Sequence, residues 1–249
     1  MAGHSKWAQI KRQKGANDAQ RGQLFTKLAK EIIVATKQGG PDPAANLRLR
    51  MAIQKAKENN MPNDNIQRAI QRGAGSGEGS DVQEVLYEGY GPAGTALLVE
   101  AATDNRNRTV AEIRNVFARA GGSLGEAGSV AWNFETRGVV TINPNGAHPD
   151  EVAMRAIDAG AVDVLIGDDA IDVYTEPADL DAVRRALEEA GLTVKQAEQS
   201  RVPKTTVQLD EKAAAQTLSL VEKLEALDDV QKVYFNAEFS DEVLAAYAG

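Results

Sequence analysis

The strongest constraint on the fold is the order of the hydrophobic segments between residues 138 and 200. Short apolar runs bounded by glycine, proline or acidic residues predict strands, and longer segments with apolar residues three and four positions apart predict helices. The expected strands are 138–142, 162–166, 171–174 and 193–199, and the expected helices are 149–159 and 179–190. This order is the β-α-β-β-α-β pattern of a ferredoxin-like unit.

The segments on either side continue the alternation of strands and helices. Strands are expected at 96–101 and 129–134 around a helix at 109–120, and at 205–209 and 231–235 around a helix at 211–227. Together these two pieces would form a second ferredoxin-like unit. The sequence therefore predicts an inserted α/β domain at 137–201 and a discontinuous α/β domain formed by 80–136 and 202–240.

Residues 1–76 predict a different kind of domain, a three-helix module that carries a basic arm. Residues 1–16 contain four Lys and Arg residues and no acidic residue, which is typical of a flexible arm. Helices are expected at 17–38, from a cap at Asp42 to Asn59-Asn60, and at 65–72, followed by a glycine-rich linker at 73–79. With this module the expected fold class is α+β.

The first of these helices is predicted to be amphipathic. Its apolar residues share one face, and three lysines fall on the opposite face, which we expect to form an outward-pointing basic ridge. The apolar residues are Leu24, Phe25, Leu28, Ile32 and Ala35, and the lysines are Lys27, Lys30 and Lys37.

The sign of the charge changes along the chain. The 249 residues have a formal net charge of −8, but residues 1–76 contain 14 basic and 5 acidic residues, a net charge of +9. Residues 77–249 contain the other 14 basic residues and 31 acidic ones, a net charge of −17. Such asymmetry indicates contact with nucleic acid, and the alternative is that the basic module docks on its own acidic body.

Catalytic and cofactor motifs are missing from the sequence. The chain contains no cysteine, which excludes disulfides, thiolate catalysis and Cys-ligated metals. The G-x-G-x-x-G match at residues 89–94 precedes an expected strand instead of a helix, so it predicts a turn. The only histidines, His4 and His148, have no triad-like neighbours, and the acids at 168–172 are typical of a solvated turn. We therefore expect a non-enzymatic protein with no cofactor, no metal and no small-molecule substrate.

The sequence also predicts the location of the protein. No apolar run approaches the roughly 18 residues of a membrane-spanning helix, and the N-terminus has no apolar region typical of a signal peptide. We expect a cytoplasmic protein without a membrane partner.

The basic arm and the first helix are the strongest candidates for a binding site. Several Lys and Arg side chains backed by a rigid core suit phosphate contact, and Trp7 among them could stack on an unpaired base or pack on the module. Arg106 and Arg108 follow an expected strand; they would orient nucleic acid or clamp nearby acids, whereas Thr109 and Glu112 form a capping box. The candidate nucleic-acid-binding residues are His4, Lys6, Trp7, Lys11, Arg12, Lys14, Arg21, Lys27, Lys30, Lys37, Arg106 and Arg108.

Several motifs resemble the YebC/PmpR family, over about residues 1–240. They are Gly3-His-Ser-Lys-Trp7, Asp18-Ala-Gln-Arg-Gly22, Phe25-Thr-Lys27, Asn59-Asn-Met-Pro-Asn63, Tyr87-Glu-Gly-Tyr-Gly-Pro92, Thr103-Asp-Asn-Arg-Asn-Arg-Thr109, Gly128-Ser-Val130 and Asp228-Asp-Val-Gln-Lys-Val233. The resemblance implies a helical N-terminal domain and two α/β domains, one inserted in the other. Gln20 and Gln23 depart from it, because many relatives have Lys there.

The resemblance also implies a role in gene expression. Family members are usually described as probable transcriptional regulators that bind DNA. A mitochondrial relative activates translation of a cytochrome oxidase subunit, and bacterial members have been assigned to the ribosome, where they relieve stalls at proline-rich stretches.

Two functions therefore stand side by side. The first is a DNA-binding transcriptional regulator, although no helix groups Arg, Asn and Gln for base readout. The second is a ribosome-associated translation factor whose arm binds ribosomal RNA, since an unstructured basic arm suits folded RNA. An enzyme with the acidic domains as its catalytic body is a third class, which no nucleophile–base pair, metal cluster or phosphate loop supports.

Overall fold

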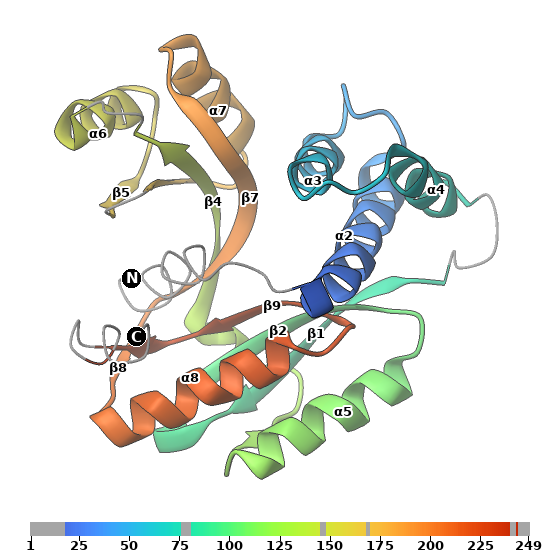
Figure 1. The fold of residues 1–249 in the computed structure, drawn as a ribbon. Helices are drawn as coiled ribbons and strands as arrows, with labels where there is room; N and C mark the ends of the chain where they lie inside the picture. The colour runs from blue at the N-terminus through green and yellow to red at the C-terminus, as the bar shows by residue number, and fades with distance from the viewer. Residues whose placement is uncertain (1–17, 76–80, 145–147, 168–169, 240–242, 244–249) are drawn as a thin grey trace. The chain divides into compact units, whose positions relative to one another are not determined.

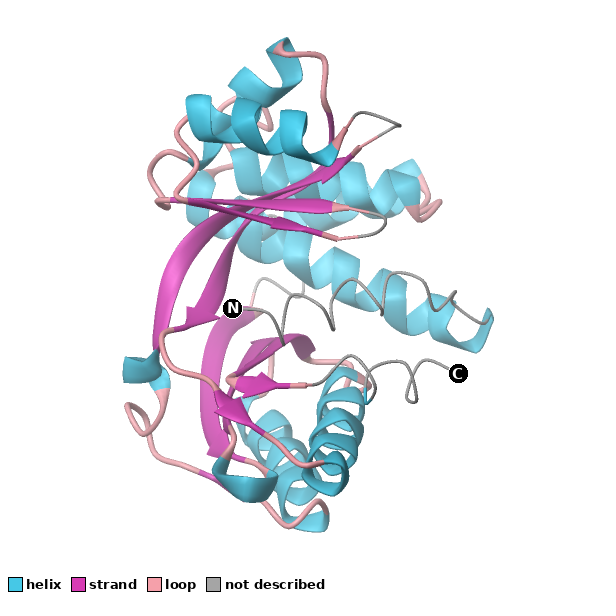
Figure 2. Cartoon of the chain, turned by 90° about the vertical axis from the view of Figure 1, so that its left-hand side faces the viewer, coloured by secondary structure: helices cyan, strands magenta, loops and turns pink. Residues whose placement is uncertain are grey.

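The computed structural model describes residues 18–75, 81–144, 148–167, 170–239 and 243 (Figure 1). Helices and four-stranded antiparallel sheets together build the fold (Figure 2), so the predicted α+β class is confirmed. The chain divides into two compact units at Asn133/Phe134 and at Lys204/Thr205. One unit contains residues 134–204, and the other contains the described segments before and after them.

Residues 134–204 form a four-stranded sheet with the order β5-β6-β4-β7, in which neighbouring strands are antiparallel. All six elements expected from the β-α-β-β-α-β pattern are present. The longest strands, β4 and β7, pair from Phe134↔Pro203 to Asn143↔Thr193, so the paired region extends four residues further than predicted at the Phe134–Pro203 end. The elements are β4 (Phe134–Asn143), α6 (Pro149–Asp158), β5 (Asp163–Ile166), β6 (Ile171–Thr175), α7 (Leu180–Glu189) and β7 (Thr193–Pro203).

A glycine allows α7 to pack closely on this sheet. A Cβ atom on Gly138 of β4 would lie 2.2 Å from Thr175 Oγ1 and 3.0 Å from the Cβ of Leu180 in α7. Because side chains alternate along a strand, Val140 and Ile142 lie on the same face as Gly138, and both are fully buried. The core of this unit therefore lies between its sheet and its two helices.

The sheet of the other unit has the order β3-β1-β2-β9 and is also antiparallel. Helices α5 and α8 contact each other and lie along one face of it (Figure 1). A separate parallel pair joins β8 to β10. The elements are β1 (Gln83–Tyr90), η1 (Pro92–Gly94), β2 (Ala96–Thr103), α5 (Arg106–Arg119), β3 (Ser123–Leu124), η2 (Ala131–Asn133), β8 (Val207–Gln208), α8 (Glu211–Glu225), β9 (Val230–Phe235) and β10 (Ala237–Glu238).

One strand of this unit was not predicted, and two predicted strands were wrong. Strand β1 was not predicted because glutamates fall on the strand face that also carries Leu86 and so hide the apolar alternation. Residues 129–134 were expected to form a strand, but they form a turn with the 3₁₀ segment η2, and β4 already begins at Phe134. The expected strand 205–209 is reduced to β8, which lies outside the main sheet.

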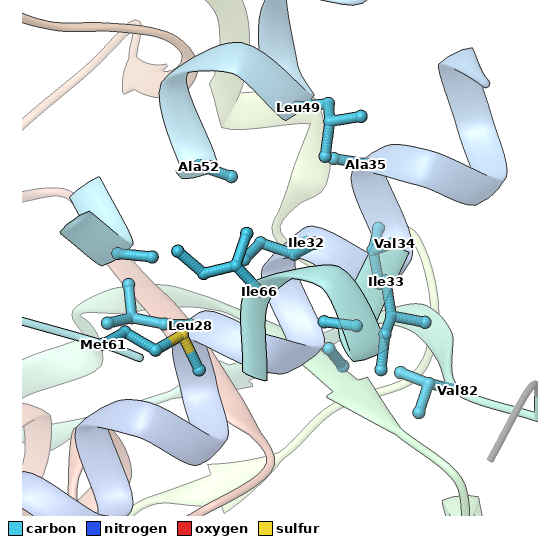
Figure 3. Packing of buried hydrophobic residues seen from close by; sticks show 13 residues of the cluster. Leu28, Ile32, Ile33, Val34, Ala35, Leu49, Ala52, Met61, Ile66 and Val82 are labelled. Atoms are coloured by element: carbon cyan, nitrogen blue, oxygen red, sulfur yellow. The ribbon is translucent and has the colours of Figure 1, made fainter. Parts of the chain in front are cut away.

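The described part of residues 1–76 contains three helices, as expected: α2 (Asp18–Gly39), α3 (Leu47–Glu58) and α4 (Asn63–Gly73). The predicted apolar stripe of α2 faces inward, since Leu28, Ile32 and Ala35 are buried and Leu24 and Phe25 are partly buried. These side chains share one core with residues of α3, α4 and the turn between them (Figure 3); the contributors are Leu49, Ala52, Ala56, Met61, Ile66 and Ala69.

The second helix begins later than predicted, because Asn46 caps it instead of Asp42. The buried Asn46 Oδ1 accepts a hydrogen bond from Leu49 N at 3.0 Å, and its Nδ2 donates to the carbonyls of Ala35 and Gly40 at 2.8 and 2.9 Å. Asp42 instead closes a turn by accepting from Ala44 N at 2.9 Å. One side chain thus caps α3 and ties it to the end of α2.

Candidate nucleic-acid interface

The lysines of α2 contact the α/β part of their own unit. Lys30 forms an ion pair with Asp229 and donates to the Asp228 carbonyl at 3.2 Å, and Lys27 donates to the Glu225 carbonyl. These acceptors lie at the C-terminal end of α8 and in the turn after it, where helix carbonyls lack intrahelical partners and the helix dipole is negative. The prediction of an outward-pointing ridge is therefore wrong for Lys27 and Lys30, which are half-buried.

Lys37 is the third lysine of the predicted ridge. Its side chain is exposed, and its Nζ donates to the Val82 carbonyl at 2.8 Å. It thus also has an intramolecular partner, at the segment that leads into β1.

Asp229 is the centre of a buried polar network. Its side chain is 2% exposed, and Oδ2 accepts hydrogen bonds from Thr109 at 2.6 Å, Arg108 at 2.8 Å and Thr103 at 3.2 Å, in addition to the Lys30 ion pair on Oδ1. Burial alone would raise the pKa of this carboxyl, but the donors from Lys30, Thr109 and Arg108 lower the pKa to about 2. An ionised carboxylate therefore joins α2, β2 and α5.

Arg108 has adopted one of the two roles that the sequence left open. It clamps two carboxylates, Asp229 at 2.8 Å and Asp104 at 2.9 Å. Arg106, two residues before it, is exposed, and its backbone carbonyl accepts from the Tyr87 hydroxyl at 3.5 Å.

The cap of α5 differs from the prediction. The helix begins at Arg106, and Asn105 caps it by accepting from Arg108 N at 3.1 Å. Thr109 lies inside the helix with its hydroxyl on Asp229, so the expected capping box of Thr109 and Glu112 is wrong. The buried carboxylate supplies the partner that the Thr109 hydroxyl requires.

A second network surrounds Arg48 of α3. Its guanidinium pairs with Glu31 of α2 at 2.9 Å and Glu84 of β1 at 2.7 Å, and lies 3.7 Å from Glu100 of β2. Burial raises the pKa of Glu100; Lys232 opposes this shift, whereas the charges of Glu84 and Glu31 add to it. Arg48 lowers the pKa of Glu84 despite its burial. Glu100 therefore retains a proton more readily than Glu84.

The structure divides the candidate binding residues into groups. The side chains of Lys27, Lys30, Lys37 and Arg108 have intramolecular partners, and Arg106, which is exposed, is a partner of Tyr87. Arg21 belongs to α2, but its side chain is not described, and His4, Lys6, Trp7, Lys11, Arg12 and Lys14 lie outside the described residues. The candidate set also omitted exposed cations of α3 and α4, which charge and helical phase indicate: Lys55, Lys57, Arg68 and Arg72.

Comparison with known proteins identifies the family. Residues 5–76 match the TACO1/YebC protein N-terminal domain, and residues 82–237 match the TACO1/YebC second and third domain. The chain belongs to the TACO1/YebC family. The resemblance found in the sequence motifs is therefore confirmed.

Relatives in the TACO1/YebC family match along almost their whole length. A probable transcriptional regulatory protein of Dehalococcoides mccartyi is 56% identical, over 99% of this chain and 98% of the relative. A protein of the same description from Herpetosiphon aurantiacus is 54% identical, over 100% and 99% of the two chains. A crystal structure of a conserved hypothetical protein from Aquifex aeolicus has a TM-score of 0.86 at 47% identity and covers 91% of this chain and 94% of its own. The chain thus shares its fold with the Aquifex aeolicus protein, and both of these curated relatives are named probable transcriptional regulatory proteins.

The described residues lack two features, a membrane-spanning helix and a cluster of metal ligands. No helix there is long and apolar enough to cross a membrane. No group of three or more His, Asp or Glu side chains in the described segments is arranged to hold a metal ion.

Proposed function

We propose that this TACO1/YebC protein is a non-enzymatic regulator of gene expression that binds nucleic acid through its basic N-terminal domain. The observation that carries the proposal is the charge division, +9 in residues 1–76 against −17 in the remainder. Nucleic-acid affinity comes largely from cations that neutralise phosphates. Because Lys27 and Lys30 already bind acceptors of their own unit, the cations proposed for this contact are those of the arm and the exposed cations of the helices.

The proposed interface therefore consists of the arm, with additional cations on the helices. His4, Lys6, Trp7, Lys11, Arg12 and Lys14 supply the arm contacts. Among the described residues, four exposed cations are the best candidates to add contacts to those of the arm. They are Lys55 and Lys57 of α3, Arg72 of α4 and Arg106 of α5.

The largest carboxyl pKa shifts support a non-enzymatic role. Asp229, Glu84 and Glu100 lie in networks that join helices to strands, where their partners are cations and hydroxyl groups of the same unit. Structural networks of this kind shift carboxyl pKa values without any catalytic role.

We also propose that the protein acts in the cytoplasm, where bacterial transcription and translation take place.

One observation favours RNA over duplex DNA as the target, and with it the second candidate function, a ribosome-associated translation factor. A recognition helix in a major groove must present a free polar face. The lysine-bearing face of α2 instead packs on the end of α8. Residues 1–16 contain four further cations, and the flexible basic arm that the sequence predicts there suits the irregular surfaces of folded RNA.

Charge reversal in the arm tests the proposed function. The variant Lys11→Glu, Arg12→Glu, Lys14→Glu is compared with Lys195→Glu, Lys212→Glu, Lys223→Glu, which makes the same charge change at exposed lysines of the acidic body. Binding to a labelled RNA hairpin and to a labelled DNA duplex is measured by fluorescence anisotropy over a series of salt concentrations. We expect the arm variant to lose about tenfold or more in affinity and to have a shallower salt dependence.

The control variant should bind nearly as well as the natural protein. Equal losses in both variants would show a general charge effect and contradict the arm as the contact. Crosslinking in cells, followed by sequencing of bound RNA and DNA, then separates the two candidates. Ribosomal RNA recovered only with residues 2–16 present supports the translation factor, and discrete promoter DNA supports the transcriptional regulator.

A further inference from the structure

Most of the exposed large apolar side chains lie at one edge of the unit of residues 134–204. Seven such side chains are exposed among the described residues, and four of them belong to α6, to β5 or to the residue directly before β5. They are Met154, Ile157, Val162 and Ile166, which are 44–67% exposed. Exposed apolar groups that cluster on one surface mark contact sites, whereas scattered ones do not. We call these four side chains the α6–β5 patch.

The strand part of the patch lies on the face of the sheet that the helices cover. Val164 and Ile166 of β5 pair with Val173 and Ile171 of β6, whose side chains are fully buried in the core of the unit. Cross-strand partners share one face of a sheet, so the Ile166 side chain lies on the same side of the sheet as α6. Helix α6 lies beside β5 (Figure 1), but it leaves this side chain 44% exposed.

The helical part of the patch lies on the side of α6 that points away from α7. Ala156 is buried in the core, and Arg155 donates to the carbonyl of Ala190, directly after α7, at 3.2 Å. At about 100° per residue, Ile157 lies on the flank opposite Arg155, and Met154 faces away from the core. Because α6 packs on β5 and β6, this flank is the one above the β5 edge of the sheet.

The backbone of β5 has groups that point out of the sheet. Among the described strands, β5 pairs with β6 alone. Gly167 N donates to the Ala170 carbonyl at 3.0 Å, and the backbone groups of an antiparallel strand point to its partner at every second residue. Those of Leu165 therefore point to β6, and those of Ile166 point outward. An edge of this kind is where a further strand can be added.

Carboxylates surround the patch. Asp150 and Asp158 lie one helical turn before and after Met154, Asp163 begins β5, and all three are exposed. Asp163 Oδ1 accepts from the Val164 N–H at 2.9 Å, a local contact that protects part of the edge. A second copy of this chain, docked by the same surface, would bring these acids against their equivalents, which is unfavourable. A basic partner would neutralise them.

We propose that the α6–β5 patch binds an extended segment of a partner protein in which apolar residues alternate with Lys or Arg. The segment pairs with the outer edge of β5. Its apolar side chains contact Ile157 and Ile166, and its cations, on the other face, meet Asp163. The alternation of side chains along a strand places the two sets on opposite faces, as this surface requires. The contact lies in the unit of residues 134–204 and does not depend on the proposed nucleic-acid binding.

Hydrogen exchange and peptide binding test the inference on the full chain. The probe is a fluorescently labelled octapeptide that alternates isoleucine with lysine. A second peptide has glutamate in place of each lysine, and a third has the composition of the probe with its isoleucines consecutive. We expect the alternating lysine peptide to bind at least tenfold more tightly than the other two. In its complex, the Ile166 amide should exchange at least tenfold more slowly, because it becomes a donor to the added strand.

Substitutions at exposed positions locate the contact. The double variant Met154→Ser, Ile157→Ser removes apolar area without a change of charge and should weaken binding of the probe about tenfold. Asp163→Asn should weaken it about two- to fivefold, as expected for an exposed ion pair. The matched control is Leu86→Ser, which removes an exposed apolar side chain of β1 and should leave the affinity unchanged. Urea unfolding verifies that each variant is folded.

Each contrary outcome overturns a different part of the inference. An unchanged affinity of the double variant, an unchanged exchange rate of the Ile166 amide, or a failure of the probe to bind would show that the patch is not the site. Equal binding of the glutamate peptide would refute the basic chemistry.

Two further outcomes would assign the edge to this chain itself. Without any peptide, slower exchange of the Ile166 amide at higher protein concentration would indicate a second copy. Slow exchange that becomes fast when residues 2–16 are deleted would indicate the chain's own arm. Binding of RNA and DNA is measured separately, so this inference and the proposed function can fail independently.

Discussion

Glu100 gives a prediction at the scale of a single residue. The folded protein raises its pKa through burial and the charges of Glu84 and Glu31, against the opposing charge of Lys232. A carboxyl with a raised pKa binds its proton more tightly in the folded state than in the unfolded state. Its contribution to stability is therefore lost as the pH rises from the ordinary range of glutamate through the raised value.

Glu100→Gln removes this titration. The variant should be more stable than the natural protein by roughly 1–3 kcal/mol at about pH 8.5, and the difference should shrink towards about pH 5. Urea unfolding at several pH values measures it. Glu84→Gln is the matched control. It should make the protein less stable at high pH, because Arg48 lowers the pKa of Glu84 and so favours its ionised form in the folded state. A stability difference for Glu100→Gln that does not change with pH would contradict this account.

The sequence revealed the charged residues but not their partners. Lys30 and Asp229 are 199 positions apart, and neither helical phase nor local spacing shows that they form an ion pair. The prediction for Arg108 came closest, because clamping a carboxylate was one of the two roles predicted for its side chain. Pairing across such distances depends on how α2 and α8 pack, which one-dimensional patterns do not contain.

At the scale of elements, Asn46 is the residue on which the start of α3 depends. Asn46→Ala removes the cap and leaves the Leu49 N–H and the Gly40 carbonyl without this partner, and we expect a loss of about 2–3 kcal/mol in the free energy of unfolding. Asp42→Ala, at the cap predicted from sequence, should cost about 0.5 kcal/mol or less, because Asp42 only closes an exposed turn. Urea unfolding of both variants checks the order, and a larger loss for Asp42→Ala would refute the assignment.

Helices were easier to predict than strands in this chain. The apolar stripe of α2 repeats over several turns and predicts both the helix and its buried face. Strand β1 includes Glu88, a charged residue whose burial depends on backbone donors in a later turn. The same donors explain why a strand was wrongly predicted at 129–134. Val130 and Phe134 are buried, as they would be in a strand, but the backbone N–H of Val130 donates to the Glu88 side chain instead of to a neighbouring strand.

At the scale of the whole molecule, we propose the domain division that the sequence predicts, with residues 137–201 as an inserted domain. The unit of residues 134–204 contains a complete four-stranded sheet, the helices α6 and α7, and a core of its own. A fragment of residues 134–204 should therefore fold alone and unfold cooperatively in urea, with backbone amide dispersion in NMR spectra typical of an ordered sheet. A fragment without a cooperative transition would show that the unit requires the rest of the chain.

The complementary chain joins Asn133 to Thr205 through a short glycine linker. It should keep its fold, because the Asn133 side chain already binds Thr205, accepting from its N–H at 3.0 Å and donating to its carbonyl at 3.0 Å. If the arm is the principal contact, this shortened chain should also retain nucleic-acid binding. Loss of binding with an intact fold would instead assign part of the interface to residues 134–204.

The position of β9 has a consequence for the order in which the chain is made. Strand β9 pairs with β2, so the sheet of the discontinuous unit is incomplete until residues 230–235 have been synthesised. Residues 134–204 are complete earlier, and domains fold as units as they emerge during synthesis. The inserted segment can thus reach its native state on the ribosome while the surrounding sheet still lacks β9.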